Sequence, residues 1–428
     1  MGMGMDMGMP PGRPGRMSLR NLRNLRTFSS FKNPVYVLYY GGMLGQMVGM
    51  NMQMLARSLL IYRLTDSAFI LGAMSLAFAV PMVGLSLFGG VIADRVQKKY
   101  VLLVGQAASA AVSIGVGITL TLGYLSAENT GSWWILVASS VFQGIIMALM
   151  MPSRQAILPE IVGEEQLMNA VSLSTMGMNA LRLFAPGIAG FLIDAVGFEA
   201  VYYTTGGMYI LSIVFIIFLP LTSTIAIRGS DTFTNIKEGF KYLRGETSIL
   251  LILVIMLVST VLAMPFQQLM PIFTEDILDV GASGLGILMS VSGAGAILVS
   301  LVLASLPNKR RGLMMLVAGI ILGLALIGFS FSSSWSLSLA LIVIVGMGQN
   351  GQMALSNTLI QYYVTPEYRG RVMSILMMQF GLMSLSTFLA GALAEVFGIQ
   401  WAVGSFAIGL AVMSVMALLF LRRVRDMD

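Results

Sequence analysis

The chain consists mainly of long apolar runs separated by short polar segments, and this alternation constrains its fold more than any other feature. A helix that crosses the hydrocarbon core of a bilayer needs about 20 predominantly apolar residues. With 10% charged and 57% hydrophobic residues, the 428-residue chain has too few charges to cover a water-soluble globule. We therefore expect an all-α membrane protein with twelve transmembrane helices. The runs lie at residues 34–61, 67–92, 100–123, 132–153, 168–193, 199–220, 248–273, 282–306, 312–331, 335–357, 371–394 and 400–421.

The longest polar stretch inside the chain separates the first six runs from the last six. We interpret it as a cytoplasmic linker at residues 221–247. It divides a six-helix half at 34–220 from a second half at 248–428, which ends in a short basic tail. Residues 1–33 are interpreted as a disordered, basic, cytoplasmic tail, whose first sixteen residues lack periodicity. Within it, Leu19, Leu22 and Leu25 are spaced by three and predict a short basic amphipathic helix at 17–26 that lies on anionic headgroups or binds a partner.

The two halves share a short pattern at the end of the fifth and the eleventh run. A glycine, an acid and a second glycine recur 201 residues apart. Tandem duplication of this kind is typical of transporters built from two pseudo-symmetric halves, although so short a match can also arise by chance. The residues are Gly190, Asp194 and Gly197 in the first half and Gly391, Glu395 and Gly398 in the second.

Positive charge is concentrated in every second connection. If both ends are cytoplasmic, 22 of the 25 Lys and Arg residues lie in cytoplasmic segments, and Arg63 is the clear exception. Lys and Arg accumulate on the cytoplasmic side of membrane proteins. We expect a multi-pass protein of the cell (inner) membrane with both termini in the cytoplasm. The net charge of +6 then reflects orientation, and we expect no nucleic-acid partner.

Several kinds of chemistry lack their usual residues here. The chain has no Cys and no His, so it has no disulfide, no thiolate metal ligand and no histidine proton relay. It also lacks the Gly-rich phosphate loop of ATP-driven transporters. We expect no enzyme activity, no cofactor and no metal site.

The connection after the second run carries a charged motif, Gly90-x-x-x-Asp94-Arg95-x-x-Lys98-Lys99. It resembles the signature loop of the major facilitator superfamily of secondary transporters. The resemblance implies a fold whose two halves rock about a central site. It also implies a latch in which Asp94 meets the positive end of a helix beginning near Arg371 and holds the cytoplasmic side closed. Alternatively, the basic residues of the motif only set the topology.

Further segments resemble the drug-efflux branch of that superfamily, which includes macrolide exporters and the enterobactin exporter. They are residues 152–162 after the fourth run and 364–372 after the tenth. The fifth run contains Pro186, Gly187 and Gly190 in a pattern similar to an antiporter motif, but it has Ala where the motif has Gly at 185 and 189. Small residues around a proline predict either a hinge or a tight helix seam.

Polar residues within the apolar runs predict a central substrate cavity. Arg182 lies about fourteen residues into the fifth run, where a charge is costly unless it faces water or a partner. In the first run, Gln46, Gln53 and Arg57 share one helical face, although Arg57 can also snorkel to the surface. Each amide can instead form an interhelical hydrogen bond. The other cavity candidates are Gln143, Gln267, Gln268, Asn350 and Gln379.

These features predict a monomeric transporter that exports an amphipathic small organic molecule, drug-like or siderophore-like, by alternating access and proton antiport. Two Arg residues within the runs and no clearly buried acid favour an anionic substrate. We find no acid placed to carry a proton through the membrane. An importer or facilitator of a small metabolite therefore stays open as an alternative, as does a nontransporting sensor or lipid-handling protein. Lipid and the small-molecule substrate are the expected partners.

Overall fold

The computed structural model describes residues 26–129, 131–222, 241–306, 309–365, 367–368, 371–372, 375–376 and 378–427. The predicted disordered tail up to residue 25 and most of the predicted linker lie outside the described residues. The side chain of Asp94 is also outside the described set, although its backbone is part of a helix.

The first half contains six long helices after a short 3-10 helix, η1 (Arg26–Lys32). Local signals set several of their ends. Asn33 caps the first long helix by accepting hydrogen bonds from two backbone N–H groups, and Gly163 and Gly197, with φ of 70° and 112°, separate the last three. The long helices are α2 (Pro34–Thr65), α3 (Ala68–Arg95), α4 (Lys98–Thr121), α5 (Trp134–Val162), α6 (Glu164–Val196) and α7 (Phe198–Ile217).

The second half also contains six long helices. Its first predicted run, 248–273, is broken, because Pro265 and Pro271 cannot donate backbone hydrogen bonds inside a helix. The run becomes α9 (Thr247–Ala263), α10 (Pro265–Gln268), α11 (Met270–Ile272) and the π-helical η2 (Phe273–Ile277). The others are α12 (Gly281–Ser305), α13 (Arg311–Ser330), α14 (Trp335–Tyr363), α16 (Gln379–Phe397), α17 (Ile399–Phe420) and the short α18 (Arg422–Arg425).

Among the described residues, eleven helices are long and apolar enough to cross a membrane. The remaining long helix, α2, has 32 residues, but Gln46, Asn51, Gln53 and Arg57 make it more polar. The predicted all-α membrane fold is confirmed, and twelve long helices agree with the predicted number. Several helix ends differ from the predicted runs: α5 continues to Val162 instead of ending near residue 153, α14 continues to Tyr363 instead of 357, and α16 begins at Gln379 instead of 371.

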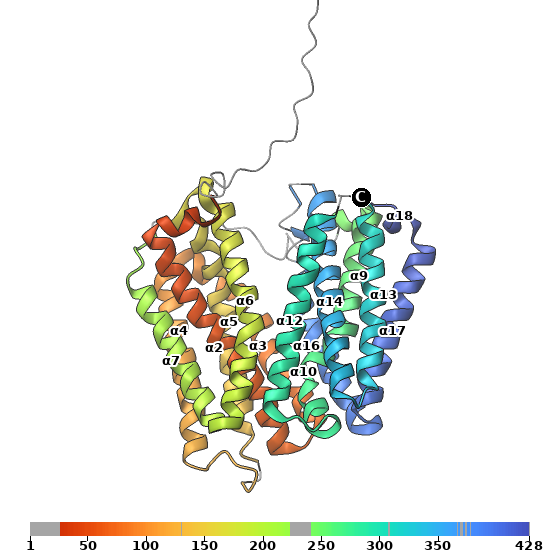
Figure 1. Cartoon of the computed structure of the whole chain (residues 1–428). Coiled ribbons are helices and arrows are strands. Elements are labelled where there is room, and N and C mark those ends of the chain that lie inside the picture. Colours follow the sequence, from red (N-terminus) through yellow and green to blue (C-terminus); the bar gives the residue numbers. More distant parts are fainter. Residues whose placement is uncertain are drawn as a thin grey trace, which may run out of the picture.

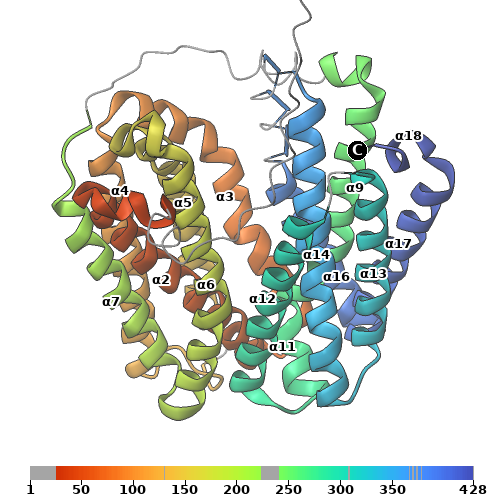
Figure 2. The same ribbon diagram turned by 45° about the horizontal axis from the view of Figure 1, so that its top comes forward.

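The two halves stand side by side, the first at the left of Figure 1 and the second at the right. We call the end at which α2 begins and α17 ends the proximal end, and the opposite end the distal end. The halves converge distally and separate proximally, and a turned view shows the same arrangement (Figure 2). Helix α3 packs on α16 and α6 packs on α12, so these four helices join the halves.

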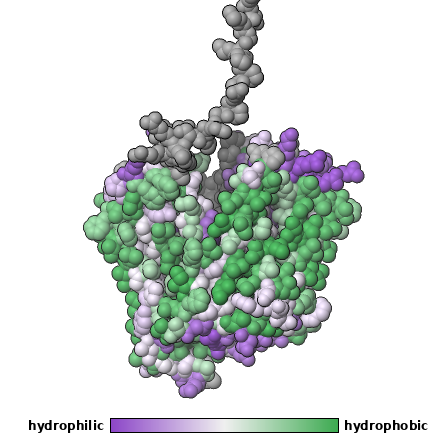
Figure 3. Space-filling view, viewed as in Figure 1, coloured by the Kyte–Doolittle hydropathy of each residue, from purple (hydrophilic) through white to green (hydrophobic). Residues whose placement is uncertain are grey.

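The apolar cores follow the same division. One large core contains residues from both halves, including Leu59 of α2, Ala189 of α6 and Leu285 of α12. Two further cores belong to one half each, one around Tyr36 and the other around Leu359. Because Tyr36 starts α2 and Leu359 is near the end of α14, both of these separate cores are proximal. A cleft that opens proximally therefore lies between the halves, and Figure 3 shows the molecule hollowed there.

Glycines allow close helix contact at the distal junction. A Cβ at Gly286 of α12 would lie 2.6 Å from the carbonyl oxygen of Pro186 in α6, and a Cβ at Gly391 of α16 would lie 2.5 Å from that of Ala68 in α3. Both neighbours are backbone atoms, so the two seams need glycine at these points.

Candidate functional site

Arg182 lies at the proximal end of a buried stripe of α6. Residues three and seven positions after it lie on nearly the same helical face. These residues, Ala185 and Ala189, are only 1% and 0% exposed and belong to the core that both halves share. Arg182 is exposed, and so is Thr175, seven residues nearer the proximal end. The face of α6 that is covered distally therefore becomes open at the level of Arg182.

Arg57 lies inside the first half. Its guanidinium stands over the Phe78 ring of α3, with Cζ 5.5 Å from the ring centroid. The phenols of Tyr202 and Tyr209 in α7 lie close enough to interact with it electrostatically. Within the part of the chain that the structure describes, no carboxylate forms an ion pair with Arg57. This arrangement suits a negatively charged group better than a positive one.

A buried hydrogen-bond network surrounds Tyr209. The Tyr209 hydroxyl donates to Gln53 Oε1 over 3.2 Å, and Gln53 Nε2 donates to Ser113 Oγ over 3.2 Å. Gln143 Nε2 lies 3.3 Å from the Tyr209 oxygen and 3.4 Å from Ser109 Oγ. The network joins α2, α4, α5 and α7, so it holds Gln53 and Gln143 in fixed positions in the first half.

Several buried polar atoms in the same half lack a protein partner. They include both side-chain amide atoms of Gln106, the Tyr202 hydroxyl, the Thr205 hydroxyl and Gln143 Oε1. Buried polar groups are costly unless they are hydrogen-bonded. The interior of the first half therefore retains unused capacity for hydrogen bonds to water or to a polar ligand.

The second half has polar contacts, but among its described residues the only cation of a long helix is Arg311, at the first position of α13. Gln352 Nε2 of α14 donates to Ser259 Oγ of α9 over 2.8 Å. Asn350 Nδ2 donates to the Ala296 carbonyl and to Ser300 Oγ, each over 2.9 Å. The Asn350 amide thus ties α14 to α12, as an interhelical hydrogen bond does. The Arg residues inside the described long helices and more than one turn from either end, namely Arg57, Arg154 and Arg182, are all in the first half.

The other predicted cavity residues are spread more widely. Gln46 is 5% exposed and lines a small space with Arg154 in the first half. Gln267 and Gln268 are half-buried in α10, and Gln379 is half-buried at the start of α16. Among the described residues, no hydrogen bond connects these four amides to the Tyr209 network.

Two of the predicted latch residues make contacts within the first half. Lys98 Nζ forms an ion pair with Glu160 of α5 over 2.8 Å. Lys99 Nζ donates to the carbonyls of Ile217 and Leu219, each over 2.7 Å, at the end of α7. These contacts link α4 to α5 and α7.

The remaining latch residues lie at the proximal end of α3, beside the open cleft. Arg95 is exposed. A Cβ at Gly90 would meet nothing within 4 Å, whereas a Cβ at Gly89 would clash with the carbonyl oxygen of Ala148 in α5. Gly89 is therefore the glycine that allows α3 to contact α5 closely in this conformation, whereas Gly90 makes no such contact.

The glycines of the fifth helix form a close seam with α12. Helix α6 continues through Pro186, which is buried. A Cβ at Gly187 would lie 3.0 Å from Ser290 Oγ, and one at Gly190 would clash with the carbonyl oxygen of Ala282. These glycines therefore allow α6 to approach α12 closely.

Sequence reasoning missed some members of these sites. Tyr209 was not considered, because a tyrosine in an apolar run has no distinguishing pattern. Gln352 follows Gln349 and Asn350, and this run of amides in an apolar helix was a usable signal. The partners of the distal acids depend on helix packing and had no local signal.

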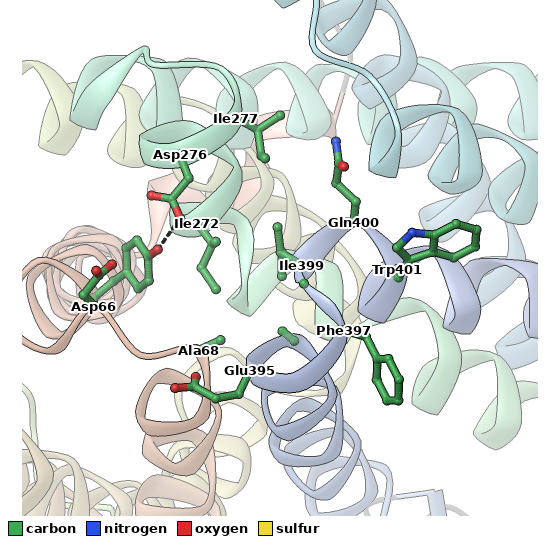
Figure 4. Close-up of a pocket in the computed structure, with 13 residues that line it drawn as sticks. Asp66, Ala68, Ile272, Asp276, Ile277, Glu395, Phe397, Ile399, Gln400 and Trp401 are labelled. Atoms are coloured by element: carbon green, nitrogen blue, oxygen red, sulfur yellow. Dashed lines mark hydrogen bonds between the residues drawn. The ribbon is translucent and has the colours of Figure 1, made fainter.

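A pocket of about 440 Å³ lies at the distal end between the halves (Figure 4). Three carboxylates line it: Asp66 at the end of α2, Asp276 in η2 and Glu395 in α16. The Tyr62 hydroxyl donates a hydrogen bond to Asp276. In the described part of the chain, no three His, Cys, Asp or Glu side chains gather closely enough to hold a metal ion.

Comparison of the sequence with known families gives one clear match. A sequence profile described as Major Facilitator Superfamily matches residues 39–385 and 276–427. Together the matched segments cover nearly the whole region of the long helices.

Named relatives are transporters. The chain is 24% identical over 371 residues to the staphyloferrin A transporter of Staphylococcus aureus, covering 86% of this chain and 90% of that protein. It is 22% identical over 340 residues to macrolide efflux protein A of Streptococcus pyogenes, covering 77% and 82% of the two chains.

Solved structures with similar folds are also transporters. The nucleoside transporter NupG matches with a TM-score of 0.71 at 14% identity, over 91% of this chain and all of that one. A bacterial homologue of the human lysosomal transporter Spinster, in an inward-facing and unoccupied conformation, matches with a TM-score of 0.68 at 13% identity, over 94% and 98% of the chains. These similarities concern the fold.

Proposed function

Because the chain belongs to the Major Facilitator Superfamily, whose members are transporters and not enzymes, we propose that it exports an amphipathic, anionic small organic molecule by alternating access. In this proposal the proximal end faces the cytoplasm, as the distribution of Lys and Arg favours. The cleft is then open to the cytoplasm, and the substrate enters it from that side. Export is driven by proton antiport.

The position of Arg182 carries the proposal. It lies where the buried stripe of α6 becomes exposed, so it is available to a molecule in the cleft. An Arg within a membrane-spanning segment is costly unless it serves a water-filled path or a ligand. Its planar, always charged guanidinium is suited to binding a carboxylate or another planar anion.

Arg57 and its surroundings support the same substrate charge. Arg57 has no carboxylate partner among the described residues, and Tyr202, Thr205 and Gln106 offer unused hydrogen-bonding atoms in the same half. The described long helices of the second half hold no Arg or Lys more than one turn from their ends, so the first half recognises the charged group in this proposal. The relatives named staphyloferrin A transporter and macrolide efflux protein A support a small organic substrate and do not bear on its charge.

The motif around Asp94 takes the role of a proximal latch in this mechanism. In the proximally open conformation Gly90 has no neighbour within 4 Å. When the cleft closes proximally, the α3 end and the helix that begins near Arg371 approach each other, and Asp94 caps that helix. The contacts of Lys98 and Lys99 within the first half keep the loop in place during the change.

Uptake into inside-out vesicles tests the proposal. Vesicles with an imposed proton gradient are offered an anionic catecholate, a macrolide and a cationic dye. We expect gradient-dependent accumulation of the catecholate, its loss in Arg182→Gln, and partial retention in Arg182→Lys, which keeps the charge. Asp94→Asn should slow transport without preventing binding.

Preference for the cationic dye, or undiminished catecholate uptake by Arg182→Gln, would contradict an anion site at Arg182. Movement that follows the substrate gradient alone would replace antiport by facilitated diffusion. Binding without any movement would favour a sensor.

A further inference from the structure

Two carboxylates at the distal end each reach from one half of the protein to the other. Asp194 lies in the last turn of α6, and its Oδ2 accepts a hydrogen bond of 2.8 Å from the backbone N–H of Ser283 in the first turn of α12. The first N–H groups of a helix have no partner within the helix and carry the positive end of its dipole. Asp194 therefore caps a helix of the opposite half with a negative charge.

Glu395 makes the corresponding contact on the other side of the molecule. It lies in the last turn of α16, and its Oε2 accepts a hydrogen bond of 3.1 Å from the backbone N–H of Phe69 in the first turn of α3. The same oxygen accepts a second hydrogen bond, of 3.2 Å, from Ser67 Oγ. Here a carboxylate of the second half caps a helix of the first.

The two contacts are related by the internal repeat. Glu395 follows Asp194 by 201 residues, and Ser283 follows Phe69 by 214. The glycine seams obey the same relation, since Gly190 meets the Ala282 carbonyl while Gly391 meets the Ala68 carbonyl. A close backbone contact and a charged cap one turn further along thus recur in both seams. Independent surface contacts have no reason to repeat in this register.

Other charged groups lie around these caps. The Arg63 guanidinium and the Asp194 carboxylate both lie beside Gly281. Arg63 forms a bidentate ion pair with Glu275, with N–O distances of 2.8 and 3.0 Å. Near Glu395, the lining of the distal pocket contains Asp66, Asp276 and Tyr62, with Tyr62 hydrogen-bonded to Asp276 (Figure 4).

We propose that Asp194 and Glu395 are a symmetric pair of charge latches that hold the distal end closed, and that neutralising them, by substitution or by protonation from the distal side, releases it. A neutral amide or acid keeps the shape of the side chain but loses most of its attraction to the helix dipole. The Arg63–Glu275 pair has no repeat-related copy among the ion pairs of the described residues, and it supports the closed end from one side only.

This inference depends on the proposed function in one respect, namely the side of the membrane from which protons arrive. Both carboxylates lie at the distal end, so protons that bind them from the distal side leave to the same side when that end closes. The pair therefore couples distal protonation to opening of the distal end, and it does not itself carry protons across the membrane.

Distances between spin labels test the latches without any substrate. The chain has no cysteine, so spin labels attach only to cysteines that are introduced. The pair Glu128→Cys and Ser333→Cys places one label on a distal loop of each half. The pair Glu165→Cys and Ser305→Cys does the same at the proximal end. The variants are Asp194→Asn, Glu395→Gln and both together, in the full chain in lipid nanodiscs.

We expect each single variant to raise the ratio of distally open to distally closed molecules about fivefold, and the double variant about 25-fold, because the two sites are independent. Asp194→Glu and Glu395→Asp, which keep the charge, should stay closer to the wild type. Asp279→Asn is the matched control, since Asp279 is an exposed distal acid with no hydrogen bond or ion pair among the described residues.

Lowering the pH should shift the distal distance distribution of the wild type toward that of the double variant. The distribution of the double variant itself should change much less. Unchanged distal distances in a folded double variant would overturn the proposal, and so would an equal shift in Asp279→Asn. A double variant that responds to pH as strongly as the wild type would overturn the role of protons at this pair. Failure of substrate transport does not affect any of these readings, because no substrate is present.

Discussion

Replacing Gly286 by alanine adds one methyl group at the point where α12 crosses α6. The added Cβ would lie 2.6 Å from the carbonyl oxygen of Pro186 and 3.1 Å from the Cα of Gly187. Both neighbours belong to the backbone, so no side-chain rotation removes the clash. The two helices must move apart at the distal end, and the proximally open conformation loses its tight seam.

The expected size follows from the cost of inserting one methyl group into a packed contact, about 1–3 kcal/mol. This cost applies to the conformation in which the distal seam is closed. Since about 1.4 kcal/mol corresponds to a tenfold change in an equilibrium constant, the ratio of distally closed to distally open molecules should fall about 5- to 150-fold. Alanine also favours a helix over glycine by about 1 kcal/mol, but this gain is equal in both conformations and cancels.

Spin-label distances at the distal and proximal reporter pairs measure the shift directly. We expect Gly286→Ala to lengthen the distal distance and shorten the proximal one. Gly391→Ala should act in the same way, because its Cβ would lie 2.5 Å from the Ala68 carbonyl in the related seam. Gly84→Ala is the matched control, since a Cβ there meets nothing within 4 Å.

The reasoning would be refuted if Gly286→Ala left both distance distributions as in the wild type while the protein remained folded. It would also be refuted by an equal change in Gly84→Ala, because the effect would then come from helix propensity and not from the seam.

Three further changes follow from other contacts. Arg57→Met should weaken binding of an anionic substrate by about tenfold or more and leave a neutral analogue nearly unaffected, as measured by equilibrium binding, with Arg57→Lys intermediate. Tyr209→Phe removes the hydroxyl that joins Gln53 to Gln143, so it should cost about 1–3 kcal/mol of stability and lower the thermal midpoint in detergent. A midpoint equal to that of the wild type would contradict this. Lys99→Met uncaps the end of α7 and should cost about 0.3–1 kcal/mol, while the spin-label distances stay unchanged.

Helix positions could be predicted well because the bilayer requires a long apolar run for each crossing. The run at 312–331 became Arg311–Ser330, and the run at 400–421 became Ile399–Phe420. The prediction failed where polar residues stay inside the protein. Residues 154–162 lie beyond the predicted run, but they continue α5, and Glu160 in this extension pairs with Lys98 of α4.

The cavity residues could be predicted only in part. Arg57, Gln53 and Gln143 were identified by their depth in apolar runs, and the structure brings the two amides together through Tyr209. Asn350 had the same sequence character but serves as a tie between α14 and α12. Depth in a run shows that a polar group needs a partner, and it does not show whether that partner is another helix or a ligand.

By itself, then, the sequence determined the membrane fold and the position of Arg57 and Arg182 along their helices, because each depends on residues close together in the chain. The tertiary structure decided what Asp194 and Glu395 do. Their partners are 89 and 326 residues away, on helices of the other half. Such a contact depends on how all the helices between them pack, and side chains only a few ångströms out of place would leave the same two acids as ordinary surface charges.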